Sequence, residues 1–146
     1  PFLKEERNLI NMIAEMIRVY LTQRFESEEL KKSEANLHAT INNTETLIWS
    51  LDHEFRLLTF NTPFQKHMKL RYDLDVATGM NLLNMHRTPE GKQLGERWKN
   101  YCMRALSGEV VSIEDRRFEI DFHYALSPII VSDRIIGVSI FATDIT

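Results

Sequence analysis

The sequence has 146 residues, of which 43% are hydrophobic and 27% are charged, and this balance is ordinary for a soluble globular domain with one sizeable core. The formal net charge of -3 provides no general attraction for nucleic acid or for an anionic membrane, so we expect no nucleic-acid partner. A single cysteine, Cys102, excludes an internal disulfide bond and favours a reducing, cytoplasmic location.

No apolar run in the sequence approaches the length of a membrane span, and no secretory signal pattern is present. The sequence begins at Pro1 rather than at Met, so we expect it to be a fragment of a longer protein. A targeting or membrane segment could lie upstream.

The first predicted element is a helix from Lys4 to about Ile41, a stretch without Gly or Pro that would be about 55 Å long. Its apolar residues recur at the spacing of a coiled-coil seam: Leu9, Ile13, Met16 and Tyr20, with Ile10 and Ile17 beside them. Two interpretations stay open at this point. The helix either folds back on its own core or pairs with a second copy in a homodimer, parallel or antiparallel. We favour the homodimer, because the rest of the chain has enough apolar residues to close its own core.

The apolar seam thins after Phe25, and residues 26–32 are almost all polar. We therefore predict a linker and dimerisation helix over residues 1–36 and a globular domain over residues 37–146.

The globular part is predicted to begin with two short strands, residues 46–51 and 55–61, that pair antiparallel across the turn at residues 52–54. Thr62 followed by Pro63 predicts the cap of a short helix that ends near Leu70.

A longer helix is predicted to begin after Thr88 and to end at Gly108. One face of this helix is apolar and carries Leu94, Trp98, Cys102 and Ala105. A weaker strand over residues 109–113 follows it.

The last stretch, residues 119–146, has the pattern of a β-hairpin around a polar break at residues 131–134. In its first half the apolar side chains alternate with polar ones: Ile120, Phe122, Tyr124 and Leu126. Its second half, residues 135–142, is apolar on both faces, which predicts a central strand that is covered on each side. Paired strands at both ends with helices between them predict an α+β domain with one antiparallel sheet and the short helices on one face.

Several separate pieces of this pattern occur in an order that resembles the PAS sensor domain, over roughly residues 34–146. The pieces are Asp52 and Asn61 around the second strand, Phe64, the stretch 104–109, Ile136-Gly137-Val138, and the closing Asp144-Ile145-Thr146. The resemblance implies a PAS-like five-stranded antiparallel sheet of order 2-1-5-4-3, preceded by a long amphipathic linker helix.

The resemblance also implies a function. Asp144, Ile145 and Thr146 would be the signal exit, where the last strand passes into a downstream output domain such as the kinase of a two-component histidine kinase. The chain would be a non-catalytic module that relays a change in its core, or in the upstream helix, to that output domain.

The resemblance gives no support to a flavin or haem cofactor. The short helical region 80–85 has no cysteine that could react with a flavin. The longer helix has no His on its apolar face to bind haem iron, so the remaining candidate haem ligand is His86, which precedes that helix. A small ligand, of unknown identity, would be lined by Leu83, Met85, Trp98 and Cys102. We favour the simpler interpretation that these side chains fill the core, since no convergent charged group marks a pocket floor.

The alternative function is a small α+β enzyme in which Asp121 and His123 act as an acid/base pair. The same strand face, with Glu119, could hold a metal ion. No nucleophile or glycine-rich phosphate loop accompanies these residues, so we favour a solvated face without a metal.

Overall fold

A computed structural model describes residues 3–84 and 88–146 of the chain. The chain divides into two compact units, residues 1–40 and residues 41–146. The predicted boundary between residues 36 and 37 lies inside the first helix, and it stays a prediction.

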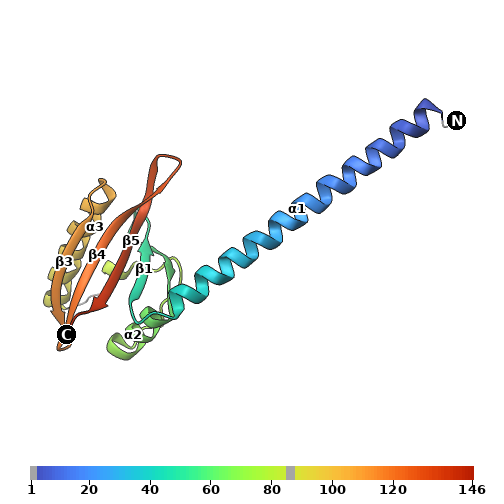
Figure 1. Ribbon diagram of the computed structural model, residues 1–146. Coiled ribbons are helices and arrows are strands. Elements are labelled where there is room, and N and C mark those ends of the chain that lie inside the picture. The colour runs from blue at the N-terminus through green and yellow to red at the C-terminus, as the bar shows by residue number, and fades with distance from the viewer. Residues whose placement is uncertain (1–2, 85–87) are drawn as a thin grey trace. The chain divides into compact units, whose positions relative to one another are not determined.

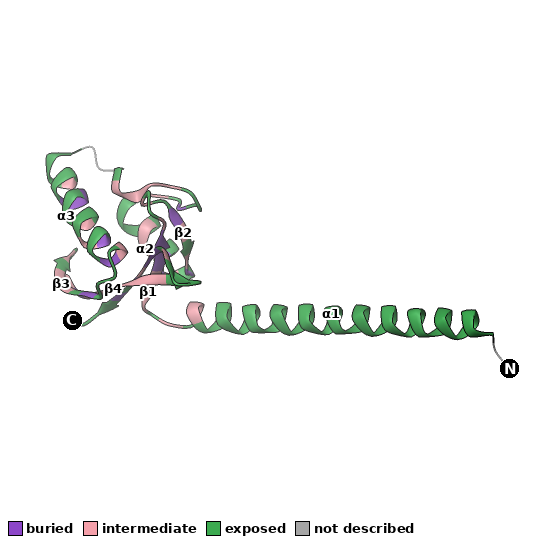
Figure 2. Cartoon of the chain, turned by 90° about the horizontal axis from the view of Figure 1, so that it is seen from above, coloured by how far each residue is buried: buried purple, intermediate pink, exposed green. Residues whose placement is uncertain are grey.

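The first helix, α1 (Lys4–Asn42), is continuous over 39 residues and has no buried residue (Figure 2). Glu5 and Glu6 lie in its first turn, where negative charge is favourable beside the free N–H groups. This unit consists of one helix, so it contains no second element that could cover the apolar side chains of the seam. Its apolar side chains are accordingly between 49% and 67% exposed at Leu9, Ile13, Met16 and Tyr20.

The globular unit is built on a five-stranded antiparallel sheet in the order β2-β1-β5-β4-β3, which confirms the predicted fold class and strand order (Figure 1). The strands are β1 (Leu47–Leu51), β2 (Leu57–Phe60), β3 (Val111–Arg117), β4 (Ile120–Val131) and β5 (Arg134–Asp144).

The closing hairpin lies inside the sheet, as predicted. Ser132 and Asp133 both have positive φ angles, of 50° and 61°, and this left-handed pair allows β4 to turn directly into β5. β5 is central in the sheet, but the helices of the globular unit cover only one of its faces. Phe141, on the other face opposite Ile48, is 41% exposed, so the expected cover on both sides is not present within this unit.

The short helices are α2 (Thr62–Tyr72), the 3-10 turn η1 (Leu82–Asn84) and α3 (Pro89–Leu106). The cap of α3 is Thr88, as predicted. The predicted cap of α2 is wrong by one residue, because Asn61 accepts the Phe64 N–H at 3.0 Å and Thr62 is already helical. α2 also continues past Leu70 to Tyr72.

Strand β3 is longer than the sequence pattern indicates. The prediction ended it at residue 113, yet residues 114–117, which are all charged, continue in register with β4 to the pair Arg117 and Ile120. Backbone hydrogen bonds to a long partner strand hold such an edge strand whatever its side chains are. The extension places Arg117 beside the core.

Gly137 in β5 lies where another backbone comes very close. A Cβ atom at this position would stand 2.3 Å from the carbonyl oxygen of Leu51, so only glycine fits without moving β1.

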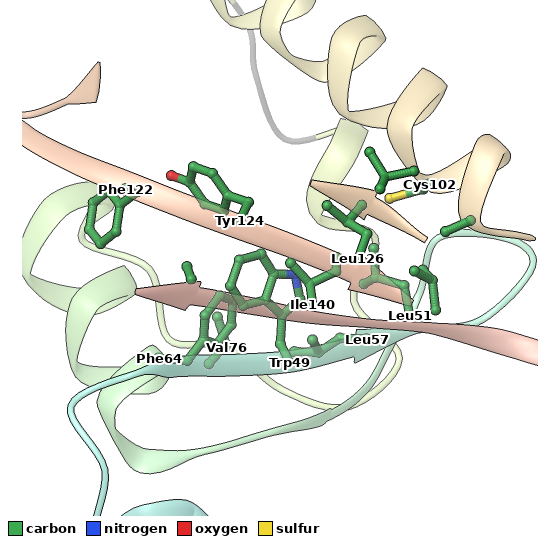
Figure 3. Packing of buried hydrophobic residues seen from close by; sticks show 14 residues of the cluster. Trp49, Leu51, Leu57, Phe64, Val76, Cys102, Phe122, Tyr124, Leu126 and Ile140 are labelled. Atoms are coloured by element: carbon green, nitrogen blue, oxygen red, sulfur yellow. The ribbon is translucent and has the colours of Figure 1, made fainter. Parts of the chain in front are cut away.

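The core lies between the sheet and the short helices (Figure 3). Its largest fully buried side chains come from β1, β3, β4, β5, α3 and the residue that opens β2: Leu51, Leu57, Cys102, Val111, Leu126, Val138 and Ile140. Leu126 and Ile140 lie opposite each other on β4 and β5.

Candidate ligand cavity

A cavity of about 230 Å³ lies in the globular unit, lined by the inner face of the sheet and by the short helices. Six of its lining side chains are aromatic: Trp49, Phe64, Tyr72, Trp98, Phe118 and Tyr124. Seven are aliphatic: Leu51, Met68, Leu74, Leu82, Leu83, Leu94 and Ile140. The other two are His67 and Arg117.

Four of the aromatic rings of the lining, those of Trp49, Phe64, Trp98 and Tyr124, form one continuous group. Trp49 stacks on Phe64 with 4.6 Å between the ring centroids, and its ring is 6.2 Å from that of Trp98. Trp98 in turn meets Tyr124 edge to face at 4.8 Å. Such a wall offers both ring faces and ring edges to a guest molecule.

Besides the ring of His67, three hydrogen-bond donors of the lining make no hydrogen bond to any other described residue. They are the indole N–H of Trp49, the hydroxyl of Tyr124 and the guanidinium of Arg117. Arg117 has only an ion pair with Asp115, whose carboxylate oxygen is 3.9 Å away. Trp49 and Tyr124 belong to the buried core, whereas the Arg117 side chain is 29% exposed. A molecule that occupies the cavity would cover these donors and would have to offer them acceptors.

The pKa of His67 is lowered from its ordinary value of 6.5, first by burial and then by the neighbouring positive charge of Arg71. Its ring meets Phe122 edge to face at 5.7 Å. His67 therefore lines the cavity as a neutral ring at pH 7, and Arg117 is the charged group of the lining.

The structure brings together only some of the residues that the sequence suggested for a pocket. Leu83 and Trp98 line the cavity. Cys102 does not; it is 0% exposed in the packed core, and burial raises the pKa of its thiol to about 12. Met85 and His86 lie outside the described residues.

Sequence reasoning missed Arg117, although a signal for it exists. Val111 is buried and Ile113 packs against the core, and Arg117 has the same parity on the strand, so the alternation points it toward the same face. The signal was lost because the strand was predicted to end at residue 113.

Asp121 and His123 each have another partner. The Asp121 carboxylate accepts two bonds of 3.1 Å from Arg116, and the His123 ring nitrogen Nε2 lies 2.7 Å from the hydroxyl of Ser112. This arrangement gives no support to the acid/base pair. No cluster of three or more His, Cys, Asp or Glu side chains suited to a metal ion, Glu119 included, occurs among residues 3–84 and 88–146.

The last three residues are tied to the start of β4. The Ile145 N–H donates to the Asp121 carbonyl at 2.8 Å, and the Asp121 N–H donates to the Thr146 hydroxyl at 3.1 Å. Hydrogen bonds from Thr146 lower the pKa of the Asp144 carboxyl.

No known protein family matches the sequence, and no curated protein matches it. Solved structures do match. They include the PAS domain of BvgS from Bordetella pertussis (14% identity, 82% of this chain and 90% of that chain, TM-score 0.56) and a sensory box sensor histidine kinase from Vibrio cholerae (17%, 82% and 95%, TM-score 0.54). A third is a phage VqmA-DPO complex (19%, 82% and 56%, TM-score 0.59).

These likenesses, together with the strand order, define the class of the globular unit: it has the fold of PAS sensor domains. None of the described helices is both long enough and apolar enough to cross a bilayer.

Proposed function

We propose that this chain is the sensory PAS module of a sensor histidine kinase and that it has no catalytic activity of its own. It would relay the state of its cavity to an output domain that follows Thr146. The observation that carries the proposal is the course of β5, which lines the cavity through Ile140 and reaches Asp144 four residues later. The likeness to a sensory box sensor histidine kinase and to the PAS domain of BvgS supports the same assignment.

The relay would work through the packing of β5. Ile140 is fully buried, and its strand pairs with β1 at Trp49 and with β4 at Leu126. A guest in the cavity would push on Ile140 and on Trp49 together, because both line it. Close-packed interiors adjust by moving between discrete packings, so this push would change the end of β5.

We also propose a second copy of this chain as the partner of α1. The exposed seam of this helix would pair with the same seam in a homodimer, as a coiled coil that passes signals from an upstream segment.

Xenon tests the relay without any assumption about ligand chemistry, since it enters apolar cavities of this size. We expect amide NMR signals of Ile140 and Trp49 to shift under xenon, and the signal of Ile145 to shift with them. Asp133, at the far tip of the hairpin, is the control position and should not move. Shifts at Ile140 and Trp49 with none at Ile145 would contradict the relay.

A further inference from the structure

We propose that the cavity takes a compact ligand built on one aromatic ring that carries a carboxylate or another anionic oxygen acceptor. The inference rests on the proposed sensory function and names the chemical class of the signal.

The size of the cavity sets the size of the ligand. An engineered protein cavity of about 150 Å³ holds benzene, so in proportion one of 230 Å³ holds roughly nine non-hydrogen atoms. One ring with a small substituent has that size, and a tricyclic flavin or a haem is much larger. The ring is favoured over an aliphatic chain because Trp49, Phe64, Trp98 and Tyr124 form a continuous aromatic wall.

The polar groups of the lining decide what the ring must carry. The Trp49 indole and the Arg117 guanidinium can only donate hydrogen bonds, and the Tyr124 hydroxyl is also free to donate. None of the three makes a hydrogen bond within the described chain, and donors that a bound ligand covers need acceptors on that ligand. The ligand therefore presents oxygen acceptors.

The positive charge of the lining favours an anionic acceptor on the ligand over a neutral one. Arg117 is the charged group of the lining, and no carboxylate of the described residues lines the cavity. The ion pair of Arg117 with Asp115 is long, with 3.9 Å between Nε and Oδ2, and the Arg117 side chain is 29% exposed. The guanidinium is thus free to bind a carboxylate with two of its N–H groups, and such charge-assisted bonds are the stronger kind.

Benzoate and benzamidine provide a matched pair of probes. They have the same ring, size and planar shape, but benzoate is an anion with acceptors only, whereas benzamidine is a cation with donors only. Toluene serves as a third probe without polar atoms. Both tryptophans of the chain line the cavity, so their two indole N–H signals in NMR report on its occupancy.

We expect benzoate to shift both indole signals saturably, with Kd on the order of 1 mM, and benzamidine to bind at least about tenfold more weakly. Arg117→Met should remove the preference for benzoate. Arg116→Met is the matched control, because Arg116 bonds to Asp121 and does not line the cavity.

Equal binding of benzoate and benzamidine, or binding of toluene without benzoate, would overturn the ligand class. So would the absence of any shift with all three probes. The proposed relay is judged separately by the xenon response at Ile145, so a failure of the one is distinguishable from a failure of the other.

Discussion

At the scale of single residues, Asn61 holds three elements together. Its side-chain oxygen accepts from the N–H groups of Ile48 and Phe64, both at 3.0 Å. Its amide nitrogen donates to the carbonyls of Ile41 and Thr46 at 3.0 and 2.9 Å. The side chain is 2% exposed and uses all its hydrogen-bonding capacity, so it joins the end of α1, strand β1 and the start of α2.

We predict that Asn61→Asp lowers the free energy of unfolding by about 2 to 4 kcal/mol. The carboxylate keeps the acceptor bonds, but it cannot donate to the two carbonyls, and it places a charge in the core. Urea unfolding followed by tryptophan fluorescence measures the change.

Asn81→Asp is the control for this substitution. Asn81 accepts from the N–H groups of Leu83 and Asn84, and its one donated bond goes to the Glu54 carbonyl near the surface. We expect a cost below about 1 kcal/mol there. Equal costs at the two positions would contradict the role given to Asn61.

His67 predicts a pH dependence of stability. Its pKa is lowered in the folded protein, so as pH falls through its ordinary value of 6.5 the unfolded chain binds the proton first. The free energy of unfolding should therefore be at its full value above about pH 7 and should decrease as the pH falls below about 6. Unfolding curves across this range should show the decrease in the wild type.

His67→Gln is the comparison, and its unfolding free energy should vary less over the same pH range. An NMR titration of the His67 ring gives the pKa directly. A midpoint at or above 6.5 would remove the basis of this prediction.

At the scale of elements, we expect α1 to form the contact of a homodimer. Ile13→Glu with Met16→Glu places two negative charges on the exposed seam, and we expect it to convert a dimer of the wild-type chain into a monomer. Sedimentation equilibrium measures the mass of both proteins.

The control is Asn8→Glu with Asn11→Glu, which adds the same charge at the same spacing on polar positions of the helix. This variant should stay dimeric. A wild-type chain that is monomeric at roughly tens of micromolar, where stable coiled coils associate, would exclude the pairing.

At the scale of the whole molecule, the division into two units predicts which part folds alone. All members of the buried core cluster lie between Trp49 and Ala142. We expect the fragment 37–146 to fold with a melting temperature within about 3 °C of that of the full chain.

A fragment of residues 44–146 is the comparison. It lacks the Ile41 carbonyl that binds Asn61 and the Asn42 side chain that accepts the Thr62 N–H at 2.6 Å. We expect it to melt several degrees lower, because it exposes these groups. An unfolded 37–146 fragment would refute the domain boundary predicted from the sequence.

The fold was largely predictable from local patterns. Alternation in residues 120–126, the polar break before Ile135 and the cap at Thr88 are each encoded within a few neighbouring residues, and the resemblance supplied the strand order. The cavity was less predictable. Its donors come from three strands, Trp49 in β1, Tyr124 in β4 and Arg117 in β3, and no short sequence window contains them together.

The sequence by itself determined the helical seam of α1, the hairpin and the α+β arrangement, because helix and strand periodicity depends on the spacing of apolar residues along the chain. Only the tertiary structure decided that β3 extends to Arg117, that Asn61 joins three elements and that Leu83 and Trp98 line a cavity. These outcomes depend on partners distant in sequence. They result from cross-strand hydrogen bonds and from close packing between elements. A short stretch of sequence does not reveal either interaction.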